Sequence, residues 1–230
     1  AVGFAASNSY AKAMSGRAHV YVVTWAMIAL STPWAALALM RQGVPPIGDE
    51  FLRAALISVS INMVGVTLQV KALSMSPLSL TVPFLAFTPL FMLIPSWVIL
   101  GEKPDAVGLA GILFIVAGGY SIHLDKIRGG LLAPIKAVMS ERGSLIMLLT
   151  AAIWSVSAVF DKVATVESSP SFYTTFFCAV FGVLYLPLLV FGLKRKRTES
   201  GTAPRLLLLG LFEAVMILSL IHISEPTRPY

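Results

Sequence analysis

Polar side chains that could bind a solute stand inside otherwise apolar stretches of this chain. Glu213 interrupts the apolar run that begins at Leu206, and it lies near the middle of that run. A charge at the centre of a bilayer costs about 2.5–3.5 kcal/mol on insertion scales, so such a side chain usually faces a cavity or a partner. Glu213 is therefore a candidate contact for a substrate or a proton.

Three further side chains are candidates to line a binding cavity. Asn62 and Gln69 are seven residues apart in another apolar run, so a helix places them two turns apart on one face. Their amides would hydrogen-bond a substrate or bridge neighbouring helices, and the sequence leaves both readings open. Trp154 would line the cavity, although an aromatic ring packs equally well between helices.

Charged residues near the ends of two other apolar runs have a plainer interpretation. Lys12 and Lys162 are expected to extend toward the membrane surface, as long basic side chains do. Asp161, beside Lys162, is expected to neutralise part of the charge at that helix end.

Four prolines, Pro77, Pro83, Pro89 and Pro95, recur every six residues within one apolar stretch. Each removes a backbone donor and clashes with the carbonyl four residues earlier. One interpretation is a bent helix that lines a substrate cavity, with Pro83 and Pro89 as the central candidates. The other is a kinked helix that only packs against its neighbours.

The elements that must position these residues follow from composition. The chain is 57% hydrophobic and 12% charged, whereas soluble domains carry about 25% charged residues. Repeated long runs contain no Asp, Glu, Lys or Arg, and in lipid such runs must be helices because their backbone groups have to pair within the segment. With a partial first run at residues 1–11 and a partial last run from residue 206, we predict an all-α polytopic bundle of about eight spans. The six complete runs cover residues 20–39, 54–70, 77–100, 106–124, 143–160 and 168–193.

Charge and motif content exclude several functional classes. The net charge of +6 comes from basic residues between the runs, which is typical of membrane proteins and does not indicate nucleic-acid binding. The single cysteine, Cys178, excludes an internal disulfide. The sequence lacks a His-Glu-x-x-His helix, a Gly-x-Ser-x-Gly elbow and a phosphate-binding glycine loop. We therefore predict no enzyme activity, no cofactor and no metal site.

A weak internal repeat divides the chain. The segment 7–12 resembles the segment 157–162, and Pro33 corresponds to Pro187. We predict a first repeat at 1–124, a connecting loop at 125–142 and a second repeat at 143–217. Five helices per repeat is an odd number, so the second copy would enter the membrane from the opposite side, an arrangement typical of secondary transporters. Residues 218–230 resemble one reading frame of a sequencing-library adapter, and we expect them to be a non-native tail.

An ordered set of motifs carries a family resemblance. Residues 72–79 read Ala-Leu-Ser-Met-Ser-Pro-Leu-Ser, followed by Pro83, by Thr-Pro-Leu-Phe at 88–91 and by Leu-Gly-Glu-Lys-Pro at 100–104. Glycines follow at 108, 111, 118 and 119. This set resembles the drug/metabolite transporter superfamily, specifically its EamA-like family. The resemblance implies ten helices in two inverted repeats and transport of small metabolites, often amino acids or drugs. On that basis the last two helices would be missing, and the chain as written is not expected to transport.

The resulting functional prediction is a secondary transporter of small metabolites in the cell membrane, working by alternating access. Its partners would be membrane lipid and a small-molecule substrate, with a coupling ion left open. The alternative is a non-transporting membrane scaffold or sensor. The glycines at 108–119 are expected to let two helices approach closely. Charge bias places the loops at 125–142 and 194–205 in the cytoplasm, whereas the family arrangement implies the opposite, so orientation stays open.

Overall fold

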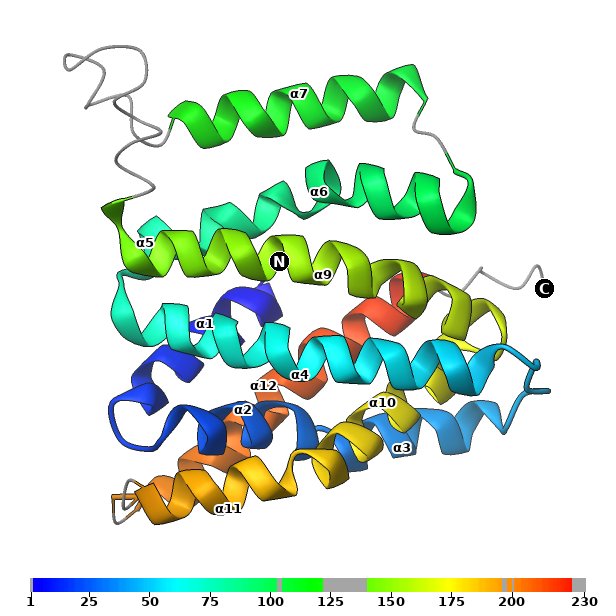
Figure 1. Cartoon of the computed structure of the whole chain (residues 1–230). Helices are drawn as coiled ribbons and strands as arrows, with labels where there is room; N and C mark the ends of the chain where they lie inside the picture. Colours follow the sequence, from blue (N-terminus) through cyan, green and yellow to red (C-terminus); the bar gives the residue numbers. More distant parts are fainter. Residues whose placement is uncertain (1, 103–104, 122–139, 196–197, 200, 225–230) are drawn as a thin grey trace. The chain divides into compact units, whose positions relative to one another are not determined.

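The computed structural model describes residues 2–102, 105–121, 140–195, 198–199 and 201–224 (Figure 1). Within these ranges the ordered elements are helices, and no strand occurs. They group into two compact units. Unit 1 contains Ala1–Met63 and Phe160–Tyr230, and unit 2 contains Val64–Val159. The predicted all-α class is confirmed for the described residues.

Each of the eight apolar segments is mostly helical in its described part. Five helical stretches are long and apolar enough to cross a membrane, and a sixth counts if one bent helix pair is a single span. The predicted number of eight is not confirmed, because α1 (Val2–Ser15) and α7 (Ala106–Ser121) have 14 and 16 described residues, fewer than the roughly 20 that a span needs. The five stretches are Val20–Gln42, Phe51–Met75, Leu78–Leu100, Arg142–Val166 and Thr202–Ser219.

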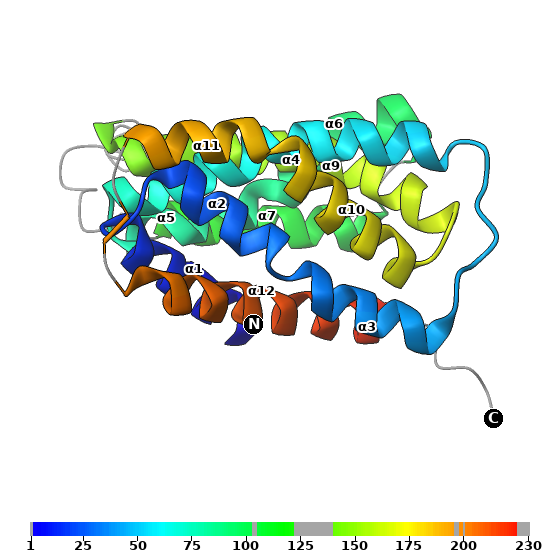
Figure 2. The ribbon, with the colours of Figure 1, turned by 90° about the horizontal axis from the view of Figure 1, so that it is seen from below.

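Unit 1 is organised around α12 (Thr202–Ser224), which packs against α1, α2 (Val20–Ala29) and α3 (Thr32–Gln42). Figure 2 shows α12 running beside α1 and below α2. The helices approach closely at Gly210, where an added Cβ would lie 2.5 Å from the Cβ of Leu30. Small residues at such crossings allow membrane helices to gain dispersion contacts that lipid cannot replace.

Unit 1 also contains α10 (Pro170–Leu184) and α11 (Leu186–Arg195), the first half of the helix Phe51–Met75 and the last turns of the helix Arg142–Val166. α10 packs against α2 and α3, and α11 packs against α2. Phe181 and Tyr185 are fully buried here and stack with ring centroids 5.0 Å apart. The indole of Trp25 donates a hydrogen bond of 2.9 Å to the carbonyl of Gly182. The Trp25 bond attaches α10 to α2, and the aromatic stack packs the end of α10 where α11 begins.

Two helix breaks in unit 1 precede proline residues. α2 ends at Ala29 and α3 begins at Thr32, with Pro33 in its first turn. α10 and α11 meet at a 49° bend just before Pro187. Proline has no N–H to continue the backbone ladder, so a break in the preceding turn is expected. The similar placement supports the predicted equivalence of Pro33 and Pro187, which stays a prediction.

In unit 2 the proline-rich stretch forms a chain of short helices. These are α5 (Leu78–Thr81), the 3₁₀ helix η1 (Val82–Phe87), α6 (Thr88–Pro95) and the π-helical turn η2 (Ser96–Leu100). As the proline spacing predicts, each interruption coincides with a proline. The carbonyl of Leu85, which Pro89 deprives of its usual partner, accepts a 2.7 Å hydrogen bond from the hydroxyl of Thr88. The backbone N–H of Thr88 also donates to this carbonyl, so the two groups of Thr88 together compensate for the donor that Pro89 lacks.

α7 packs against η1. No atom of the described residues lies within 4 Å of a Cβ added at Gly111 or Gly118. The predicted close packing on this glycine face therefore stays a prediction.

In unit 2, the start of α9 (Arg142–Val166) lies close to Ser76. The Glu141 carboxylate accepts hydrogen bonds from the backbone N–H of Ser144, at 2.6 Å, and from the hydroxyl of Ser76. Gly143 permits this approach, because an added Cβ would meet the Ser76 side chain. Partial burial by itself raises the pKa of Glu141, but the bonds from Ser144 and Ser76 outweigh it and leave the pKa below its ordinary value.

Candidate functional site

Glu213 and Ser7 form a buried polar contact that we call the Ser7–Glu213 pair. Glu213 in α12 is 3% exposed, Ser7 in α1 is fully buried, and the Ser7 hydroxyl donates to the Glu213 carboxylate at 2.5 Å. The two helices can meet because Gly3 lies against the backbone of Met216, where an added Cβ would be 3.2 Å from the Met216 Cα. Glu213 is therefore buried and has a hydrogen-bond partner on the first helix.

A second polar centre involves α4 (Phe51–Met75), α9 and α10. The hydroxyls of Ser58 and Tyr173 both donate to Oδ1 of Asp161, with Tyr173 at 2.5 Å. Ser58 and Tyr173 are also 2.8 Å from each other. We call these three side chains the Asp161 ring. Asp161 thus links α9 to α4 and α10, and its expected role of neutralising part of the charge beside Lys162 stays a prediction.

Asn62 extends the Asp161 ring by one helical turn. It is 8% exposed, and its Nδ2 donates to the Ser58 backbone carbonyl at 3.1 Å and to the Ser58 hydroxyl at 3.2 Å. Gln69, the second amide on α4, is 1% exposed and falls in unit 2. The two amides thus share a helix but belong to different compact units.

The indole of Trp154 packs against the backbone of α4 at Gly65, which has no side chain. A Cβ added at Gly65 would lie 2.7 Å from the indole Nε1 of Trp154. This Nε1 is buried and has no hydrogen-bond partner among the described residues. A buried donor without a partner carries a desolvation cost of about 1–3 kcal/mol. Trp154 therefore packs closely against α4, and its expected role in lining a substrate cavity stays a prediction.

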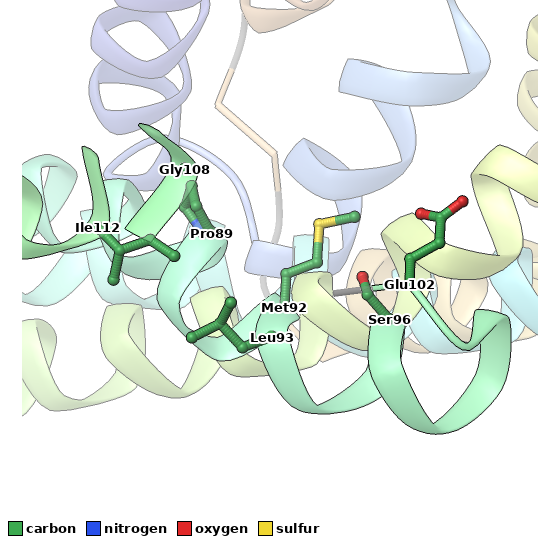
Figure 3. A pocket seen from close by; sticks show the side chains of 7 residues that line it. All are labelled: Pro89, Met92, Leu93, Ser96, Glu102, Gly108 and Ile112. Carbon is green, nitrogen blue, oxygen red and sulfur yellow. The ribbon is translucent and has the colours of Figure 1, made fainter. Parts of the chain in front are cut away.

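Pro83 lies in the first turn of η1, and Pro89 lies in the first turn of α6. Pro89 also lines a cavity between α6, η2 and α7. This α6–α7 cavity measures 280 Å³, slightly below the usual range of about 300–1,000 Å³ for ligand pockets. Figure 3 shows the Glu102 carboxylate and the Ser96 hydroxyl at one end and Ile112 at the other. The full lining is Pro89, Met92, Leu93, Ser96, Glu102, Gly108 and Ile112.

The six residues singled out from the sequence therefore fall into separate places. Glu213 and Asn62 lie in unit 1 with different partners, whereas Gln69, Trp154, Pro83 and Pro89 lie in unit 2. Sequence reasoning missed Ser58 and Tyr173 and gave Asp161 a peripheral role. The four-residue spacing of Ser58 and Asn62, which puts both on one helix face, was the available signal.

Comparison with known families gives one match. The model of the EamA-like transporter family matches residues 1–123, which is more than half of the chain. Searches among curated proteins and among solved structures give no match. The matched segment includes α1 with Ser7, α4 with its two buried amides and the proline-interrupted span. The chain is an integral membrane protein and belongs to the EamA-like transporter family.

Proposed function

We propose that the protein is a secondary transporter that moves small metabolites, such as amino acids or drug-like solutes, across the cell membrane by alternating access between two inverted repeats. The family match over residues 1–123 is the observation that carries this proposal. Residues 1–124 and 143–217 would form the two repeats.

The buried polar side chains support the proposal. A carboxylate within an apolar helix is expensive in a membrane and is retained where it serves a substrate or ion path. Glu213 is such a group, and the Ser7 hydroxyl holds it in place from α1. The breaks before Pro33 and Pro187 divide α2–α3 and the α10–α11 pair into rigid halves. Helices divided in this way are suited to rocking movements around a central site.

Solute uptake into liposomes tests the proposal. The full-length protein is reconstituted, and uptake of a labelled amino-acid mixture is compared with uptake into protein-free liposomes. We expect protein-dependent uptake that Glu213→Gln lowers about tenfold or more, because a hydrogen bond to a charged group contributes about 1.5–3 kcal/mol.

Glu50→Gln is the matched control. Its carboxylate is 61% exposed and pairs with Arg53 at the surface, so uptake by this variant should equal that of the wild type. Uptake indistinguishable from protein-free liposomes across a broad panel of labelled amino acids and cationic drugs would instead favour the scaffold or sensor alternative.

A further inference from the structure

Basic side chains gather at one end of unit 1, where two loops meet. The backbone N–H of Glu199, between α11 and α12, donates at 3.3 Å to the carbonyl of Arg17, between α1 and α2. Gly192 in α11 lies against the start of α2, because an added Cβ would be 3.1 Å from the Cβ of Tyr21. Figure 2 shows the end of α11 and the starts of α2 and α12 toward the same side of the view. We define the basic end of unit 1 by four described residues: Arg17, Lys194, Arg195 and Arg205.

The two ends of unit 1 differ in charge. The opposite end is where the backbone N–H of Gly48 donates to the carbonyl of Glu167 at 2.8 Å. Among the described residues there, three basic side chains stand against four acidic ones: Arg41, Arg53, Lys162, Asp49, Glu50, Asp161 and Glu167. The described residues at the basic end include five basic side chains and one acidic one: Lys12, Arg17, Lys194, Arg195, Arg205 and Glu199. Only the basic end therefore presents a net positive surface.

The four cations of the basic end are not neutralised by carboxylates of the protein. Within the described ranges, the ion pair that occurs joins Glu50 to Arg53 at the opposite end, and none involves the basic end. Lys194 and Arg195 are exposed, and Arg17 and Arg205 are partly exposed. Basic side chains next to a membrane attract anionic lipid headgroups. The basic end can therefore take its counter-charge from the membrane.

Aromatic side chains indicate that the basic end lies at the depth of the lipid headgroups. The ring of Tyr21, at the start of α2, is centred 4.8 Å from His19 and 6.0 Å from Phe191. The guanidinium of Arg195 lies 5.8 Å from the centre of the Phe191 ring, a distance at which a cation is attracted by the face of a ring. Tyrosine concentrates at the boundary between membrane and water. The cations are thus held where phosphate groups of lipids occur.

Apolar side chains of α11 lie directly beside these cations. Val190, Phe191 and Leu193 are half-exposed, and we call them the apolar strip. They lie within about one helical turn of Lys194 and Arg195. A phospholipid has the complementary arrangement, with a phosphate at its headgroup and acyl chains beneath it. A free phosphate ion would contact the cations and leave the apolar strip uncovered.

We propose that the basic end of unit 1 binds an anionic phospholipid, with the lipid phosphate on the four cations and an acyl chain along the apolar strip. A zwitterionic phospholipid fits less well, because its amine would bring a second positive charge to a positive surface. This binding is independent of the proposed transport function.

Native mass spectrometry of the purified full-length protein in an uncharged detergent tests the binding, because it counts the lipid molecules that the protein retains. Dioleoyl phosphatidylglycerol and dioleoyl phosphatidylcholine are titrated separately. We expect the wild type to bind phosphatidylglycerol about tenfold more tightly or better. In the double variant Lys194→Gln/Arg195→Gln, affinity for phosphatidylglycerol should fall about 25-fold, because each cation near an anionic headgroup contributes about fivefold. Affinity for phosphatidylcholine should stay the same.

Arg41→Gln/Arg53→Gln is the matched control. It removes the same charge from the opposite end of unit 1, so affinity for phosphatidylglycerol should equal that of the wild type. Arg17→Gln/Arg205→Gln removes the two cations that other segments contribute to the basic end, and it should weaken phosphatidylglycerol binding as well.

Three results would overturn the proposal. The first is equal affinity of the wild type for the two lipids. The second is an equal loss in Lys194→Gln/Arg195→Gln and in the control, which would show that only the net charge of the protein matters. The third is displacement of phosphatidylglycerol by inorganic phosphate but not by sodium chloride at the same ionic strength, which would identify a site for the free ion.

Discussion

The Ser7–Glu213 pair and the Asp161 ring each provide hydrogen-bond donors to a carboxylate on an apolar helix. Glu213 is 3% exposed and receives one hydroxyl hydrogen bond, from Ser7. Asp161 receives two, from Ser58 and Tyr173, and Asn62 adds a further link. The difference is one of redundancy. A pair fails with the loss of a single donor, whereas a ring keeps part of its bonding when one member is removed.

The largest expected effect is on the Ser7–Glu213 pair. Ser7→Ala removes the hydroxyl that Glu213 accepts from, so we expect a loss of about 1.5–3 kcal/mol in the free energy of unfolding. Unfolding in mixed detergent micelles with increasing SDS measures it. Ser9→Ala, on the exposed side of the same helix, is the control and should change little. Equal stability of Ser7→Ala and the wild type would show that the pair contributes nothing.

A smaller loss in the free energy of unfolding is expected when the α4 member of the Asp161 ring, Ser58, is removed. Ser58→Ala leaves the Tyr173 hydroxyl on Asp161, so the same measurement should give a loss of about 1 kcal/mol. The control is Ser60→Ala, because the exposed Ser60 hydroxyl bonds only the Leu56 carbonyl of its own helix. If Ser58→Ala lowers the free energy of unfolding more than Ser7→Ala does, the number of hydrogen-bond donors does not explain the difference between the two centres.

Glu141 extends the comparison to a carboxylate outside the spans. Folding lowers the pKa of Glu141. The carboxylate therefore stabilises the fold fully at a pH above its pKa in the unfolded chain, and this stabilisation is lost as the pH falls through its pKa in the folded protein. We expect Glu141→Gln to cost about 0.5–1 kcal/mol at neutral pH, as other helix N-caps do. The difference from the wild type should vanish on acidification below the ordinary value of 4.5. A pH-independent difference in SDS unfolding would show that the cap acts without its charge.

The smallest effect is expected at the surface. Glu50 and Arg53 pair at 3.6 Å with side chains 61% and 76% exposed. Exposed pairs contribute about 0–1 kcal/mol, so Arg53→Gln should change SDS unfolding by less than about 0.5 kcal/mol. A loss as large as that of Ser7→Ala would mean that burial does not set the order of these effects.

The helical architecture was predictable because a bilayer allows few alternatives. Apolar runs without charges can only be helices there, and each predicted run is mostly helical in its described part. The proline spacing likewise predicted the interrupted span from Leu78 to Leu100. The division of the α10–α11 stretch at Tyr185 was not predicted, because a single proline such as Pro187 does not by itself specify a 49° bend.

The two carboxylates differed in predictability for a physical reason. Glu213 interrupts an apolar run, so its cost in lipid is visible from the sequence alone. Asp161 lies beside Lys162 near a helix end, where a charge is inexpensive, and the local sequence therefore indicates a surface residue. Its donors, Ser58 and Tyr173, come from helices that only the tertiary fold brings to it.

The proline-interrupted span also bears on how the protein is assembled in the membrane. A segment with several missing backbone donors is a poor candidate to enter lipid alone, because each bare carbonyl must find a partner at once. α7 begins at Ala106, five residues after the left-handed Gly101, and packs against η1. The two segments are therefore suited to leave the translocation machinery as one hairpin, with the second helix shielding the first during synthesis.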